Sequence, residues 1–239
     1  GRGNTTTYTY DGLNRQVGMT DAEGGVSSNT YDADGRLIQT TNAEGAVTKY
    51  IYDDCDRVVE MIDALGNSTK YTYDAMDRVL TVTDPRGVTT YTYTDRGDVA
   101  TETDAEGYTV SYEYDGNHNM VKKTTVDGDT TYVYDELDRL ISTTTPEGNQ
   151  TSTEYDTLNQ ASSFTDALGR ITAQEYDTLG RVTKTTYADG SSVSYTYDAN
   201  GQVLTATDEM GGVVSYTYDA NGRMLTTTDP MGGVTSTTY

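Results

Sequence analysis

The sequence predicts an all-β protein, built as a repetitive meander of antiparallel β-hairpins. Three observations predict this fold class: a Tyr-x-Tyr phrase that returns about every 21 residues, two turn signals in each return, and side chains that alternate with period two between the turns. No segment carries a sustained helical period, so we expect no helices.

The second tyrosine of each phrase, or its equivalent, marks the repeat. The spacing between successive positions is constant, except that the intervals before Tyr93 and Tyr134 are one residue shorter, and an aspartate follows ten of the twelve tyrosines. This column, which we predict to form a structural ladder, is Tyr10, Tyr31, Tyr52, Tyr73, Tyr93, Tyr114, Tyr134, Tyr155, Tyr176, Tyr197, Tyr218 and Tyr239. We expect residues 1–239 to form a single array of about 11 repeats. Because the sequence starts at Gly1 and stops in mid-phrase, we interpret it as an internal fragment of a longer chain.

Each repeat contains two turn signals, one for each reversal of the chain. The first follows the Tyr-Asp pair, as in "YDADGR" (31–36) and "YDELDR" (134–139). The second has the form of "DALG" (63–66), and "DPRG" (84–87) and "DPMG" (229–232) fall in register with it. Aspartate caps its own turn, and glycine, asparagine or aspartate near the end of the turn tolerates the left-handed conformation. The turns leave strands of about six residues, an ordinary length.

The alternation of side chains assigns columns to the faces of the sheet. The two tyrosines of a phrase lie on one face. The return strand opens with an apolar residue such as Leu37 or Val58, and a threonine column follows four residues later. Stacked hairpins bring such columns into cross-strand contact, at about 0.2–1 kcal/mol for each neighbour pair. We therefore expect each hairpin to be stable only against its neighbours. Twist of roughly 20° between strands prevents a flat ribbon, so we expect it to coil into the wall of a shell or tube.

Composition limits the class of protein. The hydrophobic fraction is 34%, below the ~45–50% of globular chains, so a thick core is hard to fill. A net charge of −22 disfavours nucleic acid and anionic membranes as partners. Cys55 is the single cysteine and excludes an internal disulfide. Scarce thiols fit a secreted or cell-surface protein, which is the localisation we predict.

Catalytic and metal sites find weak support. "DADG" (32–35) and "DGD" (127–129) resemble parts of calcium loops, but the other ligands and the closing glutamate of an EF-hand are absent. A carboxylate pair for glycoside hydrolysis would be a unique site, whereas these acids recur at equivalent turn positions. His118 is expected to be exposed, and Cys55 lacks a histidine-and-acid arrangement that would activate it. We predict no catalytic residue, no cofactor and no metal, hence no enzyme.

The tyrosine column is the feature that could bind a ligand, because aromatic faces suit sugars and protein interfaces. The alternative that we favour is packing of the rings on their neighbours.

Recurrent arginines are expected to bridge to turn aspartates: Arg15, Arg36, Arg57, Arg78, Arg139, Arg181 and Arg223. "NTT" (4–6), "NST" (67–69) and "NQT" (149–151) match the glycosylation pattern.

The phrase Y-D-x-x-G-R-[LV], followed by T-D-x-x-G and T-x-Y-x-Y-D, resembles the Rhs / YD-repeat family over essentially the whole chain. The motif arginine is absent from "YTDRGD" (93–98), "YDGNHN" (114–119) and "YDTLNQ" (155–160), and the second turn is degraded around "TVDGD" (125–129). The resemblance implies a β-hairpin ribbon spiralled into a hollow shell. In bacterial Rhs toxins and insecticidal toxin complexes such a shell encloses a toxic C-terminal domain. In teneurins and wall-associated bacterial proteins, similar shells serve adhesion or contact-dependent competition. The "DPRG" and "DPMG" turns lack the flanking signature of the family's processing segment, so no protease role is carried over.

The function expected from the residues and the resemblance together is that of a non-catalytic structural scaffold, a wall segment of a hollow shell that encapsulates a toxin or effector domain. The alternative is an extracellular filament, tube or cell-surface adhesion component built from the same repeats. The expected partners are further YD repeats of the same or neighbouring chains, an enclosed toxin domain, and a surface glycan or protein. We expect no nucleic acid partner and no membrane insertion in this segment.

Overall fold

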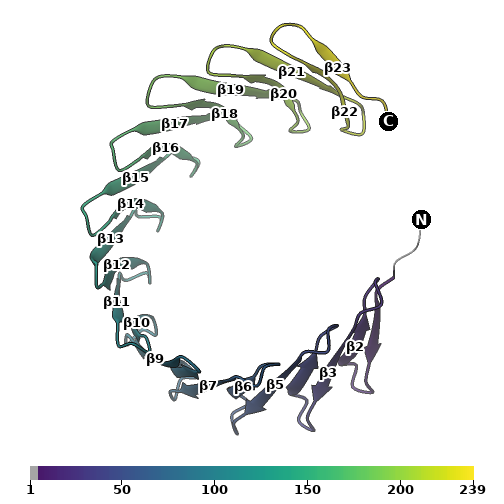
Figure 1. The fold of residues 1–239 in the computed structure, drawn as a ribbon. Coiled ribbons are helices and arrows are strands. Elements are labelled where there is room, and N and C mark those ends of the chain that lie inside the picture. The colour runs from purple at the N-terminus through teal and green to yellow at the C-terminus, as the bar shows by residue number, and fades with distance from the viewer. Residues whose placement is uncertain (1–4) are drawn as a thin grey trace. The chain divides into compact units, whose positions relative to one another are not determined.

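The computed structural model describes residues 5–239, which contain 23 β-strands and no helix (Figure 1). The predicted all-β hairpin meander is therefore confirmed. The strands are β1 (Thr7–Tyr10), β2 (Gln16–Thr20), β3 (Val26–Tyr31), β4 (Leu37–Thr41), β5 (Val47–Tyr52), β6 (Val58–Ile62), β7 (Ser68–Tyr73), β8 (Val79–Asp84), β9 (Gly87–Tyr93), β10 (Val99–Thr103), β11 (Thr109–Tyr114), β12 (Met120–Thr125), β13 (Gly128–Tyr134), β14 (Leu140–Thr144), β15 (Gln150–Tyr155), β16 (Ala161–Thr165), β17 (Ile171–Tyr176), β18 (Val182–Thr186), β19 (Ser192–Tyr197), β20 (Val203–Thr207), β21 (Val213–Tyr218), β22 (Met224–Thr228) and β23 (Val234–Ser236).

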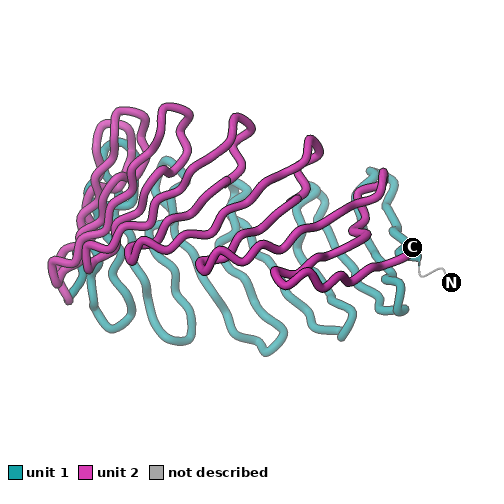
Figure 2. The backbone as a smooth tube through the Cα atoms, turned by 90° about the horizontal axis from the view of Figure 1, so that it is seen from above, with its two compact units in different colours: residues 1–113, 124–126 teal, residues 114–123, 127–239 magenta. Residues whose placement is uncertain are grey.

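The chain divides into two compact units, coloured separately in Figure 2. Unit 1 extends to Glu113 and includes Thr124–Val126, and unit 2 comprises Tyr114–Lys123 and Asp127–Tyr239. In unit 1, each strand from β1 to β10 pairs antiparallel with the next strand. In unit 2, the same holds from β13 to β23. No helix long and apolar enough to cross a membrane occurs among the described residues.

Two kinds of strand pair alternate along each unit. Across the first turn, Tyr50 faces Met61 and Tyr52 faces Val58, and the register shifts between Ile51 and Tyr52 as a β-bulge. The pair across the following turn, β6 with β7, keeps its register without a shift. A bulge adds one residue to one strand and increases the local twist. The same shift occurs directly before Tyr10, Tyr31, Tyr73, Tyr134, Tyr155, Tyr176, Tyr197 and Tyr218.

Both turns use the same hydrogen bonds. In the first turn, Oδ1 of Asp53 accepts bonds from the amides of Cys55 and Arg57 at 2.9 and 3.0 Å. In the second, Oδ1 of Asp63 accepts bonds from the amides of Leu65 and Asn67 at 2.9 and 2.8 Å. The recurrent aspartates therefore cap turns, as predicted, because their carboxylates satisfy amides that the strand ladder leaves free.

Two of the second turns are shorter than the others. β8 continues to Asp84, which pairs with Gly87 at the start of β9, so "DPRG" forms a two-residue hairpin. The prediction that "DPRG" forms the ordinary second turn is wrong, whereas "DPMG" does so, with the amide of Asp229 donating to the carbonyl of Gly233. β12 and β13 are likewise separated by two residues. The missing residue explains the two shortened intervals of the repeat, and positive φ angles of 142° and 119° at Gly87 and Gly128 let the chain reverse in the shorter space.

The described part of the chain contains no buried side chain, apolar or polar. In a tyrosine-bearing strand such as β7, exposed and half-buried residues alternate, whereas the return strand β6 is half-buried throughout. Within residues 5–239, this agrees with the prediction that a thick core is hard to fill. The sheet in each unit is a single layer, and its apolar contacts run along the sheet between neighbouring hairpins.

Candidate functional site

The predicted tyrosine column occupies one structural position in every repeat. From Tyr31 to Tyr218, each of these tyrosines ends its strand, directly before the turn, and is half-buried. Tyr10 is 55% exposed, and no repeat within the described residues precedes it to cover its ring. Tyr239, with no described repeat after it, is 66% exposed. The burial of a ring therefore depends on its neighbouring repeats.

From Tyr31 to Tyr218, most hydroxyl groups of this column reach back to the preceding repeat. The hydroxyl of Tyr52 donates to the carbonyl of Leu37 at 2.7 Å, and that of Tyr73 donates to the carbonyl of Val58 at 2.6 Å. The acceptor is the first residue of the preceding return strand, two residues before that strand begins to pair with the strand that carries the tyrosine. The same bond is made by Tyr31, Tyr93, Tyr134, Tyr155, Tyr176, Tyr197 and Tyr218.

The motif arginines cover these rings. Arg57 binds the carboxylate of Asp53 in its own turn through Nε at 2.8 Å and Nη2 at 2.7 Å. Its guanidinium carbon lies 4.8 Å from the ring centroid of Tyr73 in the next repeat. We call this Asp–Arg–Tyr set the inter-repeat clamp. Six further pairs repeat the ring contact: Arg15–Tyr31, Arg36–Tyr52, Arg78–Tyr93, Arg139–Tyr155, Arg181–Tyr197 and Arg223–Tyr239.

The predicted bridges between arginines and turn aspartates are thus confirmed, since all seven arginines pair with the aspartate four residues earlier. The contact of each arginine with the next tyrosine was not predicted. A signal for it exists in the sequence, because the arginine and the tyrosine keep the same separation along the chain in six of the seven pairs. The seventh pair, Arg78–Tyr93, spans the shortened turn and is one residue closer.

The fourth residue of the first turn in the next repeat also bonds to the clamp where it carries a side chain. Asp77 adopts a φ of 63°, a left-handed conformation that costs most side chains about 1–2 kcal/mol. Its Oδ1 accepts a bond from Nη1 of Arg57 at 2.8 Å. Asp56 and Asn159 accept bonds from the preceding arginine in the same way, at 2.7 and 2.8 Å. This bond offsets the backbone strain and explains why asparagine and aspartate stand where other repeats carry glycine.

The clamp shifts the pKa of its members in opposite directions. The side-chain hydrogen bond from Arg57 lowers the pKa of Asp53, and the equivalent arginine has this effect on Asp74. Burial raises the pKa of Tyr52 and Tyr73. At neutral pH the clamp therefore holds a carboxylate, a guanidinium and a neutral phenol, the charge states that its bonds require.

In repeats that lack the motif arginine, other side chains make the hydrogen bond to the next repeat. Nδ2 of Asn119 donates to Asp138 of the next repeat at 2.7 Å, and Nε2 of Gln202 donates to the carbonyl of Gly222 at 2.8 Å. The departure at Gln202 was not recognised from the sequence. A side-chain amide in place of the arginine still makes a hydrogen bond to the next repeat, but it carries no charge.

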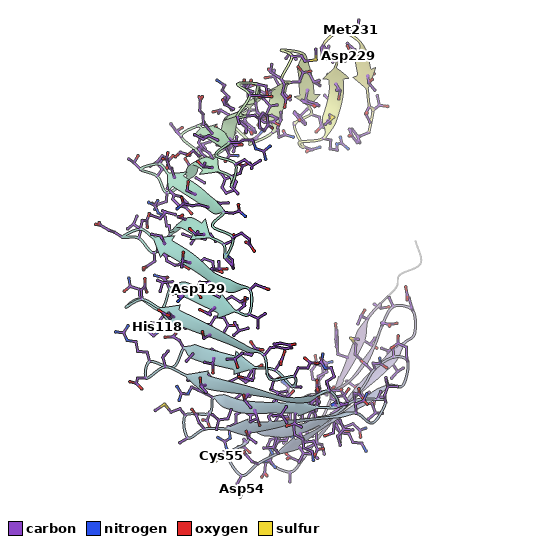
Figure 3. All side chains as sticks on the ribbon, turned by 60° about the vertical axis from the view of Figure 1, so that its left-hand side comes forward. Asp54, Cys55, His118, Asp129, Asp229 and Met231 are labelled. Atoms are coloured by element: carbon purple, nitrogen blue, oxygen red, sulfur yellow. The ribbon has the colours of Figure 1, made fainter. Side chains whose placement is uncertain are left out.

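The other candidate residues lie in turns. Cys55 and His118 are exposed, as expected for His118, and Figure 3 shows Cys55 beside Asp54 at the end of a hairpin. Asp32 of "DADG" caps its own turn, and Asp129 of "DGD" pairs with Lys122 at 2.8 Å. Residues 5–239 contain no group of three or more His, Cys, Asp or Glu side chains that could hold a metal ion.

The glycosylation patterns lie at turns or outside the described chain. Asn67 and Asn149 are exposed residues of second turns, and Nδ2 of Asn67 donates to Asp63 at 2.8 Å. Asn4 lies outside the described residues.

These contacts define a β-hairpin repeat protein in which each repeat is held by its neighbours. The profile of the RHS Repeat family matches residues 1–26, 31–67, 56–89, 93–130, 121–150, 134–163, 155–192 and 197–239, and the chain belongs to this family. A comparison with curated proteins gave no match.

The solved structures that are similar to this chain include two crystal structures. That of TcdB2-TccC3-TEV has a TM-score of 0.54 and 16% identity, with 96% of this chain and 18% of that chain covered. That of TcdB2-TccC3 has a TM-score of 0.54 and 16% identity, with 94% and 17% covered. The chain spans less than a fifth of either protein. At this identity the similarity shows the fold alone.

Proposed function

We propose that the chain is a non-catalytic structural scaffold, a wall segment of a hollow RHS/YD-repeat shell that encapsulates a toxin or effector domain. The observation that carries the proposal is the inter-repeat clamp. It ties each repeat to the next along a single-layer sheet that has no buried core in the described residues. A sheet stabilised in this way extends by adding repeats and suits a wall, since its thickness does not grow with its length.

Membership of the RHS Repeat family and the fold shared with TcdB2-TccC3 support this role. The proposed partners are further RHS repeats, joined to residues 1–239 as one array, and an enclosed toxin component. We place such an assembly outside the cell or at its surface. A net charge of −22 agrees with this proposal, because it disfavours contact with nucleic acid.

The absence of catalysis is part of the proposal. The turn carboxylates, the most numerous reactive groups, are engaged by backbone amides and arginines in a pattern that recurs from repeat to repeat. Hydrogen bonds from the neighbouring arginine lower the pKa values of Asp53 and Asp74, which suits capping and ion pairing rather than proton donation at neutral pH.

The alternative is an extracellular filament, tube or surface-adhesion component. The uniformity of the clamp favours it, because the ring contact appears with near-constant geometry, from 4.3 to 5.3 Å, in both units. An open tube can consist of repeats alone, whereas a closed shell needs plugs and irregular ends.

The experiment that separates the two uses the protein from the complete reading frame that encodes this chain. Negative-stain electron microscopy and limited proteolysis are applied to that protein, with its downstream domain produced alone as a protease-sensitive control. The shell proposal expects closed particles and a downstream domain that resists protease until the particle is opened. Long fibres, or a downstream domain that is cleaved as fast as the control, would contradict it.

A further inference from the structure

One stretch of unit 2 lacks the first tyrosine of the Tyr-x-Tyr phrase in two successive repeats. Thr153 stands at this position in β15 and Gln174 stands there in β17. The repeats on either side retain their rings, Tyr132 in β13 and Tyr195 in β19, and both rings are half-buried. The sheet has therefore lost two consecutive aromatic rings from one face.

The single phenylalanine of the chain lies in this gap. Phe164 in β16 is directly opposite Thr153 on one side and Thr172 on the other, so the three side chains share a face. Gln174 lies two residues beyond Thr172 on the same strand and hence on this face as well. The Phe164 side chain is 46% exposed. Where the rings are missing, an aromatic side chain remains uncovered.

Three hollows adjoin Phe164 within unit 2. The largest, of about 320 Å³, extends from Phe164 past Thr172 to Tyr187 at the next turn. A second, of about 210 Å³, is lined by Phe164, Thr172 and Gln174, and a third, of about 110 Å³, reaches Thr153. Together we call them the Phe164 hollow. The largest alone reaches the lower end of the size range of ligand pockets, about 300 Å³.

The turns beside the hollow carry a surplus of acidic side chains. Asp166 is neutralised by Arg170, which it contacts at 2.6 Å. Asp189 lines the largest hollow, and the equivalent turns of the neighbouring repeats add Glu147 and Glu209, both exposed. With a net charge of −22 over the chain, this edge attracts a cationic partner.

We propose that the Phe164 hollow is a docking site for a polypeptide segment that inserts one aromatic side chain between flanking lysines or arginines. The chain itself supplies the argument for the aromatic ring. At the equivalent position of the repeats before and after, the same face of the sheet accommodates the phenol rings of Tyr132 and Tyr195, so a ring supplied by a partner finds matching surroundings. Exposed aromatic side chains anchor protein interfaces, and the surplus of carboxylates favours basic residues beside the anchor. This site goes beyond the scaffold role and does not depend on whether the array forms a shell or a tube.

The test uses a heptapeptide, Lys-Arg-Ser-Trp-Ser-Arg-Lys, acetylated and amidated at its ends, and the full chain. The chain contains no tryptophan, so excitation at wavelengths above the tyrosine absorption band selects the emission of the peptide, and the one phenylalanine of the chain gives a single resonance when labelled with fluorine. We expect saturable binding that shifts the Phe164 resonance. The same peptide with alanine in place of tryptophan is expected to bind at least 10-fold more weakly.

Gln174→Tyr restores the ring of the repeat consensus and fills the hollow from within. We expect it to weaken peptide binding at least 10-fold while the circular dichroism spectrum and urea midpoint stay at or above those of the unaltered chain. Asn29→Tyr is the matched control, since it makes the same type of change in unit 1 and is expected to leave binding unchanged.

Several results would overturn the site. The alanine peptide could bind as tightly as the tryptophan peptide, or Gln174→Tyr could leave peptide binding unchanged. The tryptophan peptide could also fail to bind at millimolar concentration. Finally, an oligosaccharide such as cellopentaose could shift the Phe164 resonance while the peptide does not.

Discussion

The replacement Tyr73→Phe isolates the hydroxyl bond of the inter-repeat clamp. The ring and its contact with Arg57, 4.8 Å from the guanidinium carbon, stay in place, while the 2.6 Å bond to the carbonyl of Val58 is lost. A hydrogen bond of this kind contributes a net ~0.5–1.5 kcal/mol to stability. Val58 is half-buried, so water can reach its freed carbonyl, and we expect a loss of ~1 kcal/mol. That loss corresponds to a factor of ~5 in the local opening equilibrium.

Native-state hydrogen exchange measures this loss where it occurs. The amides of β6 and β7 are expected to exchange ~5-fold faster in Tyr73→Phe, while those of β1 and β2 keep their rates. Tyr73→Ala removes the ring as well, and we expect a cost of ~3 kcal/mol, near the low end of the range for deleted aromatic side chains. Tyr10→Phe is the control, because Tyr10 is 55% exposed and its hydroxyl makes no bond within the described residues. If Tyr73→Phe exchanges like the unaltered chain, or if Tyr10→Phe has an equal effect, the clamp does not stabilise the array as we infer.

Three further predictions follow from the clamp. The capping aspartates of the clamp have lowered pKa values, so they stabilise the folded chain fully above the ordinary pKa of 3.8, and this stabilisation is lost as pH falls through the folded values. The difference in urea midpoint between the unaltered chain and Asp53→Asn is therefore expected to shrink below pH 4. A difference that stays constant with pH would contradict this prediction. Burial raises the pKa of Tyr52 and Tyr73 from 10.0, so these tyrosines stabilise the folded chain below pH 10, and this stabilisation disappears as pH rises through the folded values. Spectrophotometric titration is expected to show a late-ionising group of tyrosines that ionises together with unfolding. Ionisation of all 22 tyrosines near pH 10 without unfolding would refute this prediction. Asp77 has a φ of 63°, a conformation in which alanine is strained and glycine is not. Both Asp77→Ala and Asp77→Gly lose the bond to Arg57, so we expect the alanine variant to be less stable by ~1 kcal/mol in urea unfolding. Equal stability of the two variants would show that the turn does not require the left-handed conformation.

The hairpin meander could be predicted because its determinants are local and recur. The aspartate that caps a turn and the strand that follows it lie close together in the sequence, so the constant period of the repeat places every strand. The shortened interval before Tyr93 was also visible, but the two-residue turn at Asp84–Gly87 became clear only from the pairing of these two residues.

The clamp could be predicted only in part. The pairing of Arg57 with Asp53 is local, whereas the hydroxyl of Tyr73 binds a backbone carbonyl, and side-chain patterns give no indication of which carbonyl lies outside the strand ladder. The Phe164 hollow was not predicted either. It arises from the combined loss of tyrosines at Thr153 and Gln174, and the size of a vacancy depends on how the surrounding side chains pack.

The shared hydrogen-bonding scheme of successive turns has a consequence for how such genes change length. Excision of residues 53–73 would join Tyr52 to Asp74, and the new junction would again read Tyr-Asp followed by the arginine Arg78. Arg36 would then meet Asp77 in place of Asp56, a carboxylate at the same turn position. Recombination between copies in whole multiples of the period therefore lengthens or shortens the protein and leaves a normal repeat at the junction. The two shortened hairpins show that a second turn can also lose one residue without misaligning the columns downstream.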